Sequence, residues 1–303
     1  IWQSAIHGKA LSTAWGWGRP KDTNNSVWQS FSYRPDCIAK IGHTAYDLNR
    51  LARELEPVVK AKENVAVLQS LPSRVYNLEY MNAAYLIWKN SLFLGQRVEF
   101  LPEGQIERAK DYPLLFITHA NNVFADTLTG IKDYIDNGGK VFIMGEDSLK
   151  YDEHQNPHDE ALVKYIKDRS VFIPTTFEGA QITSPTESEV FDKLRAILKD
   201  NGFLRVEVTD TETGLPAKEV EYNYAEYNGN MIINLLNYTY DKTKNLKITV
   251  DGKQVDSAKE LRTLTGVGSD IAIEPYVPIL LKVGDAEGIS VKMTINNSKM
   301  TVN

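Results

Sequence analysis

Between residues 64 and 200, short apolar runs alternate with amphipathic stretches whose apolar residues recur at three- and four-residue spacing. The short runs are typical of buried parallel strands, because a strand covered on both faces is apolar throughout. The predicted strands are Val65–Leu68, Val98–Leu101, Leu114–Ile117, Lys140–Met144 and Val171–Ile173, and the predicted helices are Glu79–Leu94, Gln105–Lys110, Phe124–Asn137, Glu160–Lys167 and Glu187–Lys199. This alternation predicts an open parallel sheet with helices on both faces and right-handed crossovers.

The first long helix of this region has a stripe of apolar residues that we expect to face the sheet. The stripe comprises Met81, Ala84, Tyr85, Trp88 and Leu92. Their spacing matches one face of a helix, and Gly95 is expected to end it.

After residue 203 the pattern changes to short strands separated by turns. The predicted strands are Leu204–Thr209, Val220–Tyr227, Met231–Tyr238, Leu246–Val250, Ile271–Ile273 and Pro278–Val283. Asn228-Gly229 and Asp251-Gly252 are strong hairpin signals, because both residue types tolerate the positive φ of a tight turn. This region is predicted to be an all-β sandwich or barrel, with one more hairpin in the tail from Ile289 to Val302.

The first 57 residues carry too few elements to bury a core of their own. Leu11–Pro20 is predicted to be a strand that runs into a polar loop. A helix is then predicted from Pro35 to Pro57, with Ile38, Ile41, Ala45, Leu48, Leu51, Ala52 and Leu55 as its apolar stripe. We expect this segment to pack on chain upstream of it or on the next domain, and we expect the natural protein to begin before Ile1.

Composition narrows the class of protein. Hydrophobic residues make up 42% and charged residues 24% of the chain, which is close to the globular average. The net charge is -6 and no basic stripe occurs, so we expect no nucleic-acid partner. No apolar run reaches the ~20 residues that span a bilayer, so no membrane segment is predicted. Cys37 is the single cysteine, which leaves a cytoplasmic and a secreted location equally open.

Neither a cofactor nor a metal is predicted. The segment after the first strand, Leu68–Arg74, contains no glycine that would let the backbone approach the phosphates of a flavin or dinucleotide. His154 and His158 lie among three acidic residues, but zinc sites usually present their histidines in a firmer arrangement. We interpret this polar, proline-containing segment as a solvated loop.

The opening segment resembles a known family. Trp2-Gln3, His7-Gly8 and the strand with Trp15-Gly16-Trp17 resemble the eighth-strand region of clan A glycoside hydrolases. The helix Asp47–Leu55 resembles the helix that leaves such a barrel. Among these enzymes, the chain resembles the family 42 β-galactosidases and their relatives.

Two later blocks extend the resemblance. Residues 65–146 resemble the β-galactosidase trimerisation domain, a flavodoxin-like fold, in the phrases Ala84-Tyr85, Gly95–Phe100 and Tyr134–Phe142. The last hundred residues resemble the small β-domain of such proteins in Asn234–Asn237 and Leu264–Gly266. The loop after Arg19 departs from the family 42 pattern, so another family with the same architecture stays open.

The resemblance implies three domains. Residues 1–57 would be the terminal strand and helix of a (β/α)8 TIM barrel, residues 58–202 a flavodoxin-like trimerisation-type domain, and residues 203–303 a C-terminal β-sandwich. It also implies a carbohydrate substrate, contact with the upstream barrel of the same polypeptide, and a homotrimer. The acid/base and nucleophile of such enzymes lie at the ends of the fourth and seventh barrel strands, so no catalytic residue is expected in this chain.

Four residues are candidates for contact with a sugar. Trp15 and Trp17 lie two apart on a predicted strand, so their side chains share one face, which at a barrel end points toward the mouth. Indole rings stack on the C–H faces of sugars, and Arg19 and Trp28 in the following loop could add polar and stacking contacts. The other interpretation is that these tryptophans belong to a core. We interpret His7 as a packing histidine.

Three functions remain open from the sequence. The first is the C-terminal region of a retaining, β-galactosidase-like glycoside hydrolase. The second is a non-catalytic carbohydrate-binding or scaffold protein built from the same parts. The third is an amidotransferase-like α/β enzyme, with His119 at a strand end. This third function has the least support, because Cys37 lies outside the α/β region and no Gly-x-Ser-x-Gly turn is present.

Overall fold

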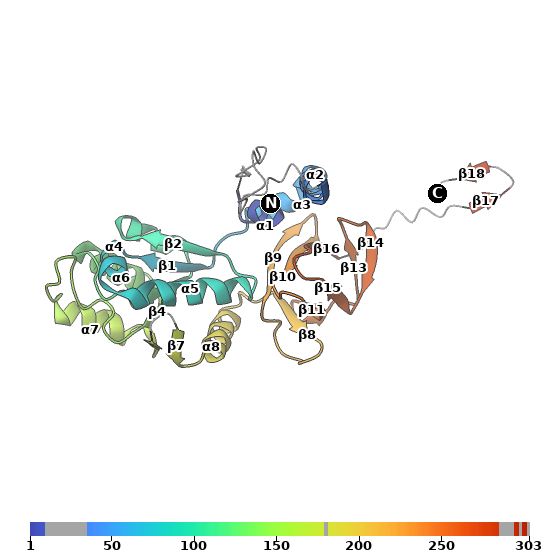
Figure 1. The fold of residues 1–303 in the computed structure, drawn as a ribbon. Helices are drawn as coiled ribbons and strands as arrows, with labels where there is room; N and C mark the ends of the chain where they lie inside the picture. The colour runs from blue at the N-terminus through green and yellow to red at the C-terminus, as the bar shows by residue number, and fades with distance from the viewer. Residues whose placement is uncertain (10–34, 179–180, 285–293, 297–298, 302–303) are drawn as a thin grey trace, which may run out of the picture.

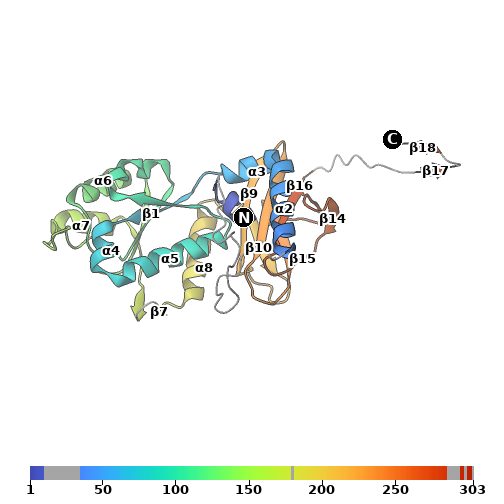
Figure 2. The ribbon, with the colours of Figure 1, turned by 45° about the horizontal axis from the view of Figure 1, so that its top comes forward.

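The computed structural model describes residues 1–9, 35–178, 181–284, 294–296 and 299–301. A parallel α/β unit and a β-sandwich lie side by side, and helices from the start of the chain lie on the sandwich (Figures 1 and 2). The fold predicted from the sequence, a flavodoxin-like α/β unit followed by a β-sandwich, is confirmed.

The parallel sheet contains the five predicted strands. They are β1 (Val65–Gln69), β2 (Val98–Pro102), β3 (Leu114–Thr118), β4 (Lys140–Met144) and β5 (Val171–Ile173). Their order is β2-β1-β3-β4-β5, and all neighbours are parallel. Every residue of β3 is buried, as its position in the middle of a doubly covered sheet requires. The strand order changes direction between β1 and β3, because β2 lies on one side of β1 while β3, β4 and β5 follow on its other side.

Helices cover both faces of this sheet. On one face α5 (Leu78–Leu92) and α8 (Glu187–Asp200) pack against Val65, Val67 and Phe116. On the other face η2 (Glu103–Asp111), α6 (Ala125–Asp136) and α7 (Glu160–Asp168) pack against Ala66 and Leu68. The short helix α4 (Leu71–Tyr76) follows β1, and a hairpin of β6 (Thr176–Glu178) and β7 (Gln181–Ser184) follows β5.

The predicted apolar face of α5 is partly wrong. Ala84 and Leu92 are buried as expected, but Met81 and Tyr85 are 45% and 55% exposed. The helix is apolar around most of its circumference, so spacing alone does not select the buried side. The side that faces the sheet carries Ala83, Ala84 and Ile87, and the two alanines let the helix lie close to the strands. Tyr80, near the start of the helix, is buried in the cluster that contains Leu68.

The second unit is a sandwich of two antiparallel sheets. One sheet has the order β14-β13-β16-β10-β9, and the other consists of β12, β11 and β15 with β8 paired to β11. The strands are β8 (Val206–Asp210), β9 (Val220–Tyr227), β10 (Asn230–Asn237), β11 (Lys244–Val250), β12 (Lys253–Gln254), β13 (Ser257–Glu260), β14 (Thr265–Gly268), β15 (Ile271–Ile273) and β16 (Ile279–Val283). Ile233, Leu235, Ile248 and Leu281 lie in the core between the sheets. In the tail, β17 (Thr294–Asn296) and β18 (Lys299–Thr301) form the predicted extra hairpin.

The helices at the start of the chain pack on the outer face of the sandwich. They are α1 (Trp2–Ile6), α2 (Pro35–Arg50) and α3 (Ala52–Val59). Trp2, Ile6, Leu55 and Val58 contact Ile232 of β10 and other apolar residues there, so β10 is buried on both faces. The apolar residues of this segment therefore pack on the last unit of the chain, and Arg97 of the α/β unit only donates hydrogen bonds to the carbonyl oxygens of Val58 and Val59. The expected helix end at Pro57 is also wrong, since α3 continues to Val59 and the break lies at Leu51.

Raising the pH above 10 is expected to destabilise the α/β unit through Tyr80. Burial raises the pKa of Tyr80 to about 12, so the folded protein keeps this phenol protonated while the unfolded chain ionises it. The stabilisation is complete below pH 10 and is lost as the pH rises toward 12, about 1.4 kcal/mol of it at pH 11. Burial also raises the pKa of Tyr134, in the same direction. Thermal unfolding at pH 9 to 11.5 measures the loss.

The Tyr80→Phe variant provides the control for this pH dependence. It loses the hydrogen bonds of the Tyr80 hydroxyl with Leu68 and Ser70 at every pH, which lowers stability by a constant amount. Its stability should then fall less steeply above pH 10 than that of the parent. An unchanged slope would show that Tyr80 does not carry the effect.

Candidate functional site

The four residues predicted to contact a sugar, Trp15, Trp17, Arg19 and Trp28, lie outside the described residues. The barrel strand predicted at Leu11–Pro20 lies there too. Their roles therefore stay predictions, and the sites described next come from other parts of the chain.

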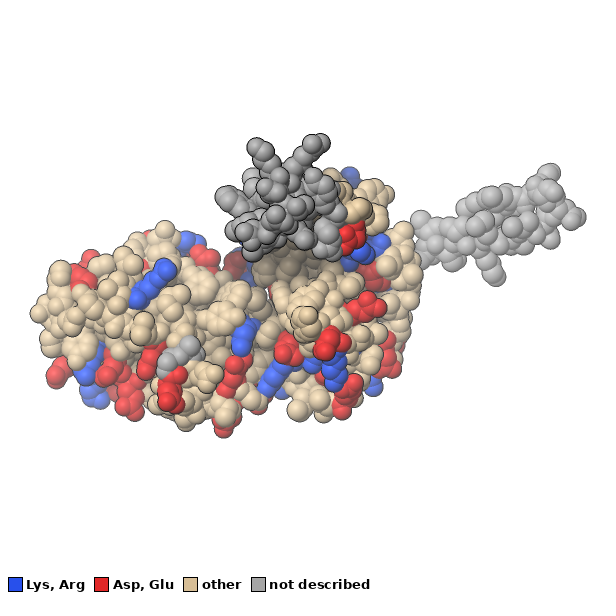
Figure 3. Space-filling model, in the orientation of Figure 1, with Lys and Arg blue, Asp and Glu red and all other residues tan. Residues whose placement is uncertain are grey.

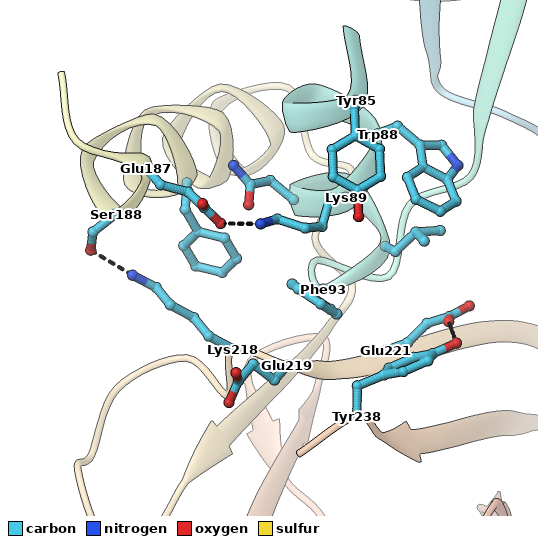
Figure 4. A pocket seen from close by; sticks show the side chains of 13 residues that line it. Tyr85, Trp88, Lys89, Phe93, Glu187, Ser188, Lys218, Glu219, Glu221 and Tyr238 are labelled. Carbon is cyan, nitrogen blue, oxygen red and sulfur yellow. Dashed lines mark hydrogen bonds and ion pairs between the residues drawn. The ribbon is translucent and has the colours of Figure 1, made fainter. Parts of the chain in front are cut away.

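A cleft of about 690 Å³ lies between the α/β unit and the sandwich. One wall comes from α5 and the start of α8, and the other from the loop before β9, β9 itself and the end of β10 (Figure 4). The lining residues are Tyr85, Trp88, Lys89, Asn90, Leu92, Phe93, Glu187, Ser188, Phe191, Lys218, Glu219, Glu221 and Tyr238. Pockets of this size at the junction of two units are common positions for small-molecule sites.

Aromatic rings and an ion pair form the α5 side of the cleft. Tyr85 and Trp88 have ring centroids 5.5 Å apart and planes inclined by 36°. Lys89 Nζ lies 5.9 Å from the centre of the Tyr85 ring and 2.5 Å from Glu187 Oε1 of α8. Figure 4 shows this pair spanning from one helix to the other above the cleft. Helices α5 and α8 thus place aromatic rings and charged side chains along the same side of the cleft.

Polar groups on the sandwich side are also held in place. Lys218 Nζ donates a hydrogen bond to Ser188 Oγ at 2.5 Å and lies over the ring of Phe191. The Tyr238 hydroxyl donates to Glu221 Oε2 at 2.7 Å. Burial, and then the carboxylate of Glu221, raise the pKa of Tyr238, so its hydroxyl stays a hydrogen-bond donor at neutral pH.

Glu221 links the cleft to the start of the chain. Its carboxylate is almost wholly buried, and Oε1 lies 2.6 Å from His7 Nε2 and accepts a hydrogen bond from Gln3 Nε2 at 2.5 Å. A buried carboxylate is tolerated only when such partners replace water. Nearby, Trp2 Nε1 donates to Asn234 Oδ1 at 2.7 Å. His7 itself is exposed, and its ring lies against the buried Glu221 carboxylate, which helps to hold the start of the chain on the sandwich.

A second polar cluster lies at the carboxyl end of β3, near the point where the sheet order reverses. His119 Nδ1 is 3.0 Å from Glu79 Oε2, and Nε2 is 2.7 Å from Thr175 Oγ1. His119 has a φ of 49°, and a side chain at Gly145 would collide with its ring. Burial lowers the pKa of His119, and Glu79 opposes that shift. A neutral imidazole here donates to Glu79 and accepts from Thr175, which ties three elements together.

The structure also shows the position of Cys37 and of the residues that could bind a metal ion. Cys37 is on α2, outside the α/β unit, so it does not supply a nucleophile near His119. Within the part of the chain that the structure describes, no group of three His, Cys, Asp or Glu residues is placed to hold a metal ion. On the face seen in Figure 3, Lys and Arg are interspersed with Asp and Glu. None of the described helices has the length and apolar character needed to cross a membrane.

The arrangement of a flavodoxin-like unit, a β-sandwich and packed N-terminal helices can be compared with solved structures. No protein-family model and no curated protein sequence matches the chain. An apo exo-carrageenase of family GH42 from Bacteroides ovatus matches with a TM-score of 0.76 and 19% identity, over 93% of this chain and 38% of that one.

Two β-galactosidases give weaker matches. The enzyme from Bacillus circulans sp. alkalophilus matches with a TM-score of 0.55 and 10% identity, over 82% of this chain and 45% of that one. A catalytic mutant of a GH42 β-galactosidase from G. stearothermophilus matches with a TM-score of 0.57 and 11% identity, over 79% and 44%. The chain spans less than half the length of these structures. The resemblance to family 42 is thus confirmed as a likeness of fold.

Proposed function

We propose that this chain is the C-terminal region of a glycoside hydrolase that cleaves β-linked galactosides with retention of configuration. The observation that carries the proposal is the match to the GH42 exo-carrageenase, which extends over 93% of the chain with a TM-score of 0.76. Fold alone does not define an activity, so the chemistry rests on the likeness to these enzymes. The two catalytic carboxyl groups, about 5–5.5 Å apart in retaining enzymes, would lie on an upstream barrel.

Within such an enzyme, this chain would supply the substrate wall and contacts between domains. We assign the wall to Trp15, Trp17, Arg19 and Trp28. The exposure of α2 supports a contact with the barrel, because none of its side chains is buried although Ile38 and Ile41 are apolar. A helix with an unburied apolar stripe normally packs on another element.

An assay of the full-length parent tests this function. We expect hydrolysis of 4-nitrophenyl β-D-galactopyranoside or carrageenan, and loss of that activity when either of the two catalytic acidic residues of the barrel is replaced by its amide. In the active parent, Trp15→Ala or Trp17→Ala should lower kcat/KM while Tyr240→Ala, at a strongly exposed position, leaves it unchanged. Absence of hydrolysis, or of a pair of acidic residues at the barrel strand ends, would instead favour a non-catalytic carbohydrate-binding or scaffold protein.

The surface of α4 and the start of α5 supports the proposed oligomer. Leu71, Val75, Leu78 and Met81 are all large, apolar and exposed, and Leu78 is 88% exposed. We call these four residues the α4–α5 face. Exposed apolar side chains gathered on adjacent helices are typical of protein–protein contacts. We propose that this face meets another copy of the chain in a homotrimer.

Replacing Val75 and Leu78 by aspartate together is expected to convert the trimer to monomers. Two charges would have to be buried without partners, which costs several kcal/mol per contact. Mass photometry at nanomolar to micromolar concentration measures the change. The control is Leu215→Asp, which also alters an exposed leucine but lies on the sandwich. A parent chain that is monomeric, or a double variant that stays trimeric, would contradict the assignment of this face.

A further inference from the structure

We propose that the cleft between α5, α8 and the sandwich is a non-catalytic binding site for a neutral oligosaccharide. The choice of a sugar as ligand rests on the proposed function, whereas the site itself rests on its geometry. The described residues that line the cleft belong to α5, the start of α8 and the sandwich. The site would hold a chain of sugars without taking part in its cleavage.

The first argument is the pair of aromatic rings on α5. The Tyr85 side chain is more than half exposed although it lies beside the core face of the helix, so it contributes little to the stability of the fold. Trp88 follows one turn later, and the two inclined rings line the same wall. A pyranose has an apolar face of C–H groups, which packs on such rings. Tyrosine and tryptophan also present a polar tip that can bond to hydroxyls.

The second argument is an unpartnered amide in the wall. Asn90 lines the cleft, is only 2% exposed, and its Nδ2 has no hydrogen-bond partner among the described residues. Leaving a buried donor unsatisfied costs about 1–3 kcal/mol. A ligand hydroxyl that reaches this amide would accept its hydrogen bond and recover that free energy on binding.

The charges of the cleft favour an uncharged ligand. Two lysines, Lys89 and Lys218, face three glutamates, and Lys89 already pairs with Glu187. No positive excess is left to attract a sulfate or carboxylate. Fixed donors and acceptors that stand side by side match the hydroxyl groups of a neutral sugar, each of which both donates and accepts.

Binding of neutral tetrasaccharides to the 303-residue chain tests the proposal. The probes are β-1,4-galactotetraose, cellotetraose, xylotetraose and mannotetraose, each titrated to 10 mM and followed by calorimetry and tryptophan fluorescence. We expect at least one to bind, and Tyr85→Ala to weaken it at least about tenfold, which corresponds to about 1.4 kcal/mol. Trp88→Ala should act in the same direction. The control is Tyr240→Ala, which removes another strongly exposed tyrosine and should leave binding unchanged.

Three outcomes would overturn the proposal. They are no binding of any probe at 10 mM, binding that Tyr85→Ala and Trp88→Ala leave intact, and a Tyr85→Ala variant whose oligomeric state changes, which would make the cleft a subunit contact. These outcomes are separate from the test of the enzyme. Binding to the cleft in a parent without hydrolytic activity would overturn only the proposed function, and hydrolysis without binding to the cleft would overturn only this inference.

Discussion

Replacing Gly95 by alanine is expected to destabilise the protein by about 4 kcal/mol. Gly95 follows α5 with a φ of 67°, and a Cβ there would lie 2.3 Å from Cε2 of Tyr222. Tyr222 is buried in the sandwich core and its hydroxyl donates to Val206, so its ring cannot move freely. The backbone strain costs about 1–3 kcal/mol and the overlap a similar amount. Chemical denaturation of the purified variant measures the change.

Substitutions at two other glycines measure the backbone strain and the steric overlap separately. Gly138 also has a positive φ, of 86°, but open space around its Cβ position, so Gly138→Ala should show only the strain, about 1 kcal/mol. Gly104 has open space and no positive φ, so Gly104→Ala should be almost neutral. Adding Tyr222→Leu to Gly95→Ala should recover part of the loss. If Gly95→Ala is no worse than Gly138→Ala, the close approach to Tyr222 does not constrain the fold.

Replacing Glu221 by alanine is expected to cost about 3–5 kcal/mol and to loosen the start of the chain. The variant leaves Gln3 and Tyr238 without the acceptor to which both donate, and His7 without its partner. Removing one member of a buried polar network usually costs this much, because the remaining groups stay desolvated. Hydrogen exchange should show faster exchange in α1, and thermal unfolding should show the lower stability.

Glu219 provides a matched control, since it lies two residues away in the same cleft wall with an exposed side chain. Glu219→Ala should be close to neutral. The phenol of Tyr238 gives an independent measurement, because removing the Glu221 carboxylate takes away one cause of its raised pKa. Ultraviolet titration should then show one tyrosine that ionises at lower pH. Unchanged exchange in α1 would mean that Glu221 does not hold that helix.

The sequence predicted the elements of the α/β unit well because their signal is local. A strand such as Leu114–Thr118 is apolar at nearly every position, which follows directly from burial on both faces. Strand β10 shows the same property for a different reason, since α1 and α3 cover its outer side. That pattern was visible in the sequence, but nothing nearby in the chain identified the covering partner.

Features that depend on distant segments could not be predicted. On α5, apolar residues lie on more than one side, and only the packing against the sheet decides that Tyr80 is buried and Tyr85 exposed. The cleft combines residues from α5, α8, β9 and β10, and no sequence motif predicts that these residues come together. His119 was noticed at its strand end, but its contacts with Glu79 and Thr175 arise only from the folded sheet.

The bond between Trp2 and Asn234 joins residues 232 positions apart. Synthesis at roughly 5–20 residues per second would separate their emergence from the ribosome by on the order of 10–50 s. During this interval the α/β unit, which is continuous in sequence, has all its strands and helices available to fold. The apolar side of α1 must wait for β10, so nascent chains in this window expose a surface that a chaperone can bind, and α1 reaches its final place only after the residues of β10 have been made.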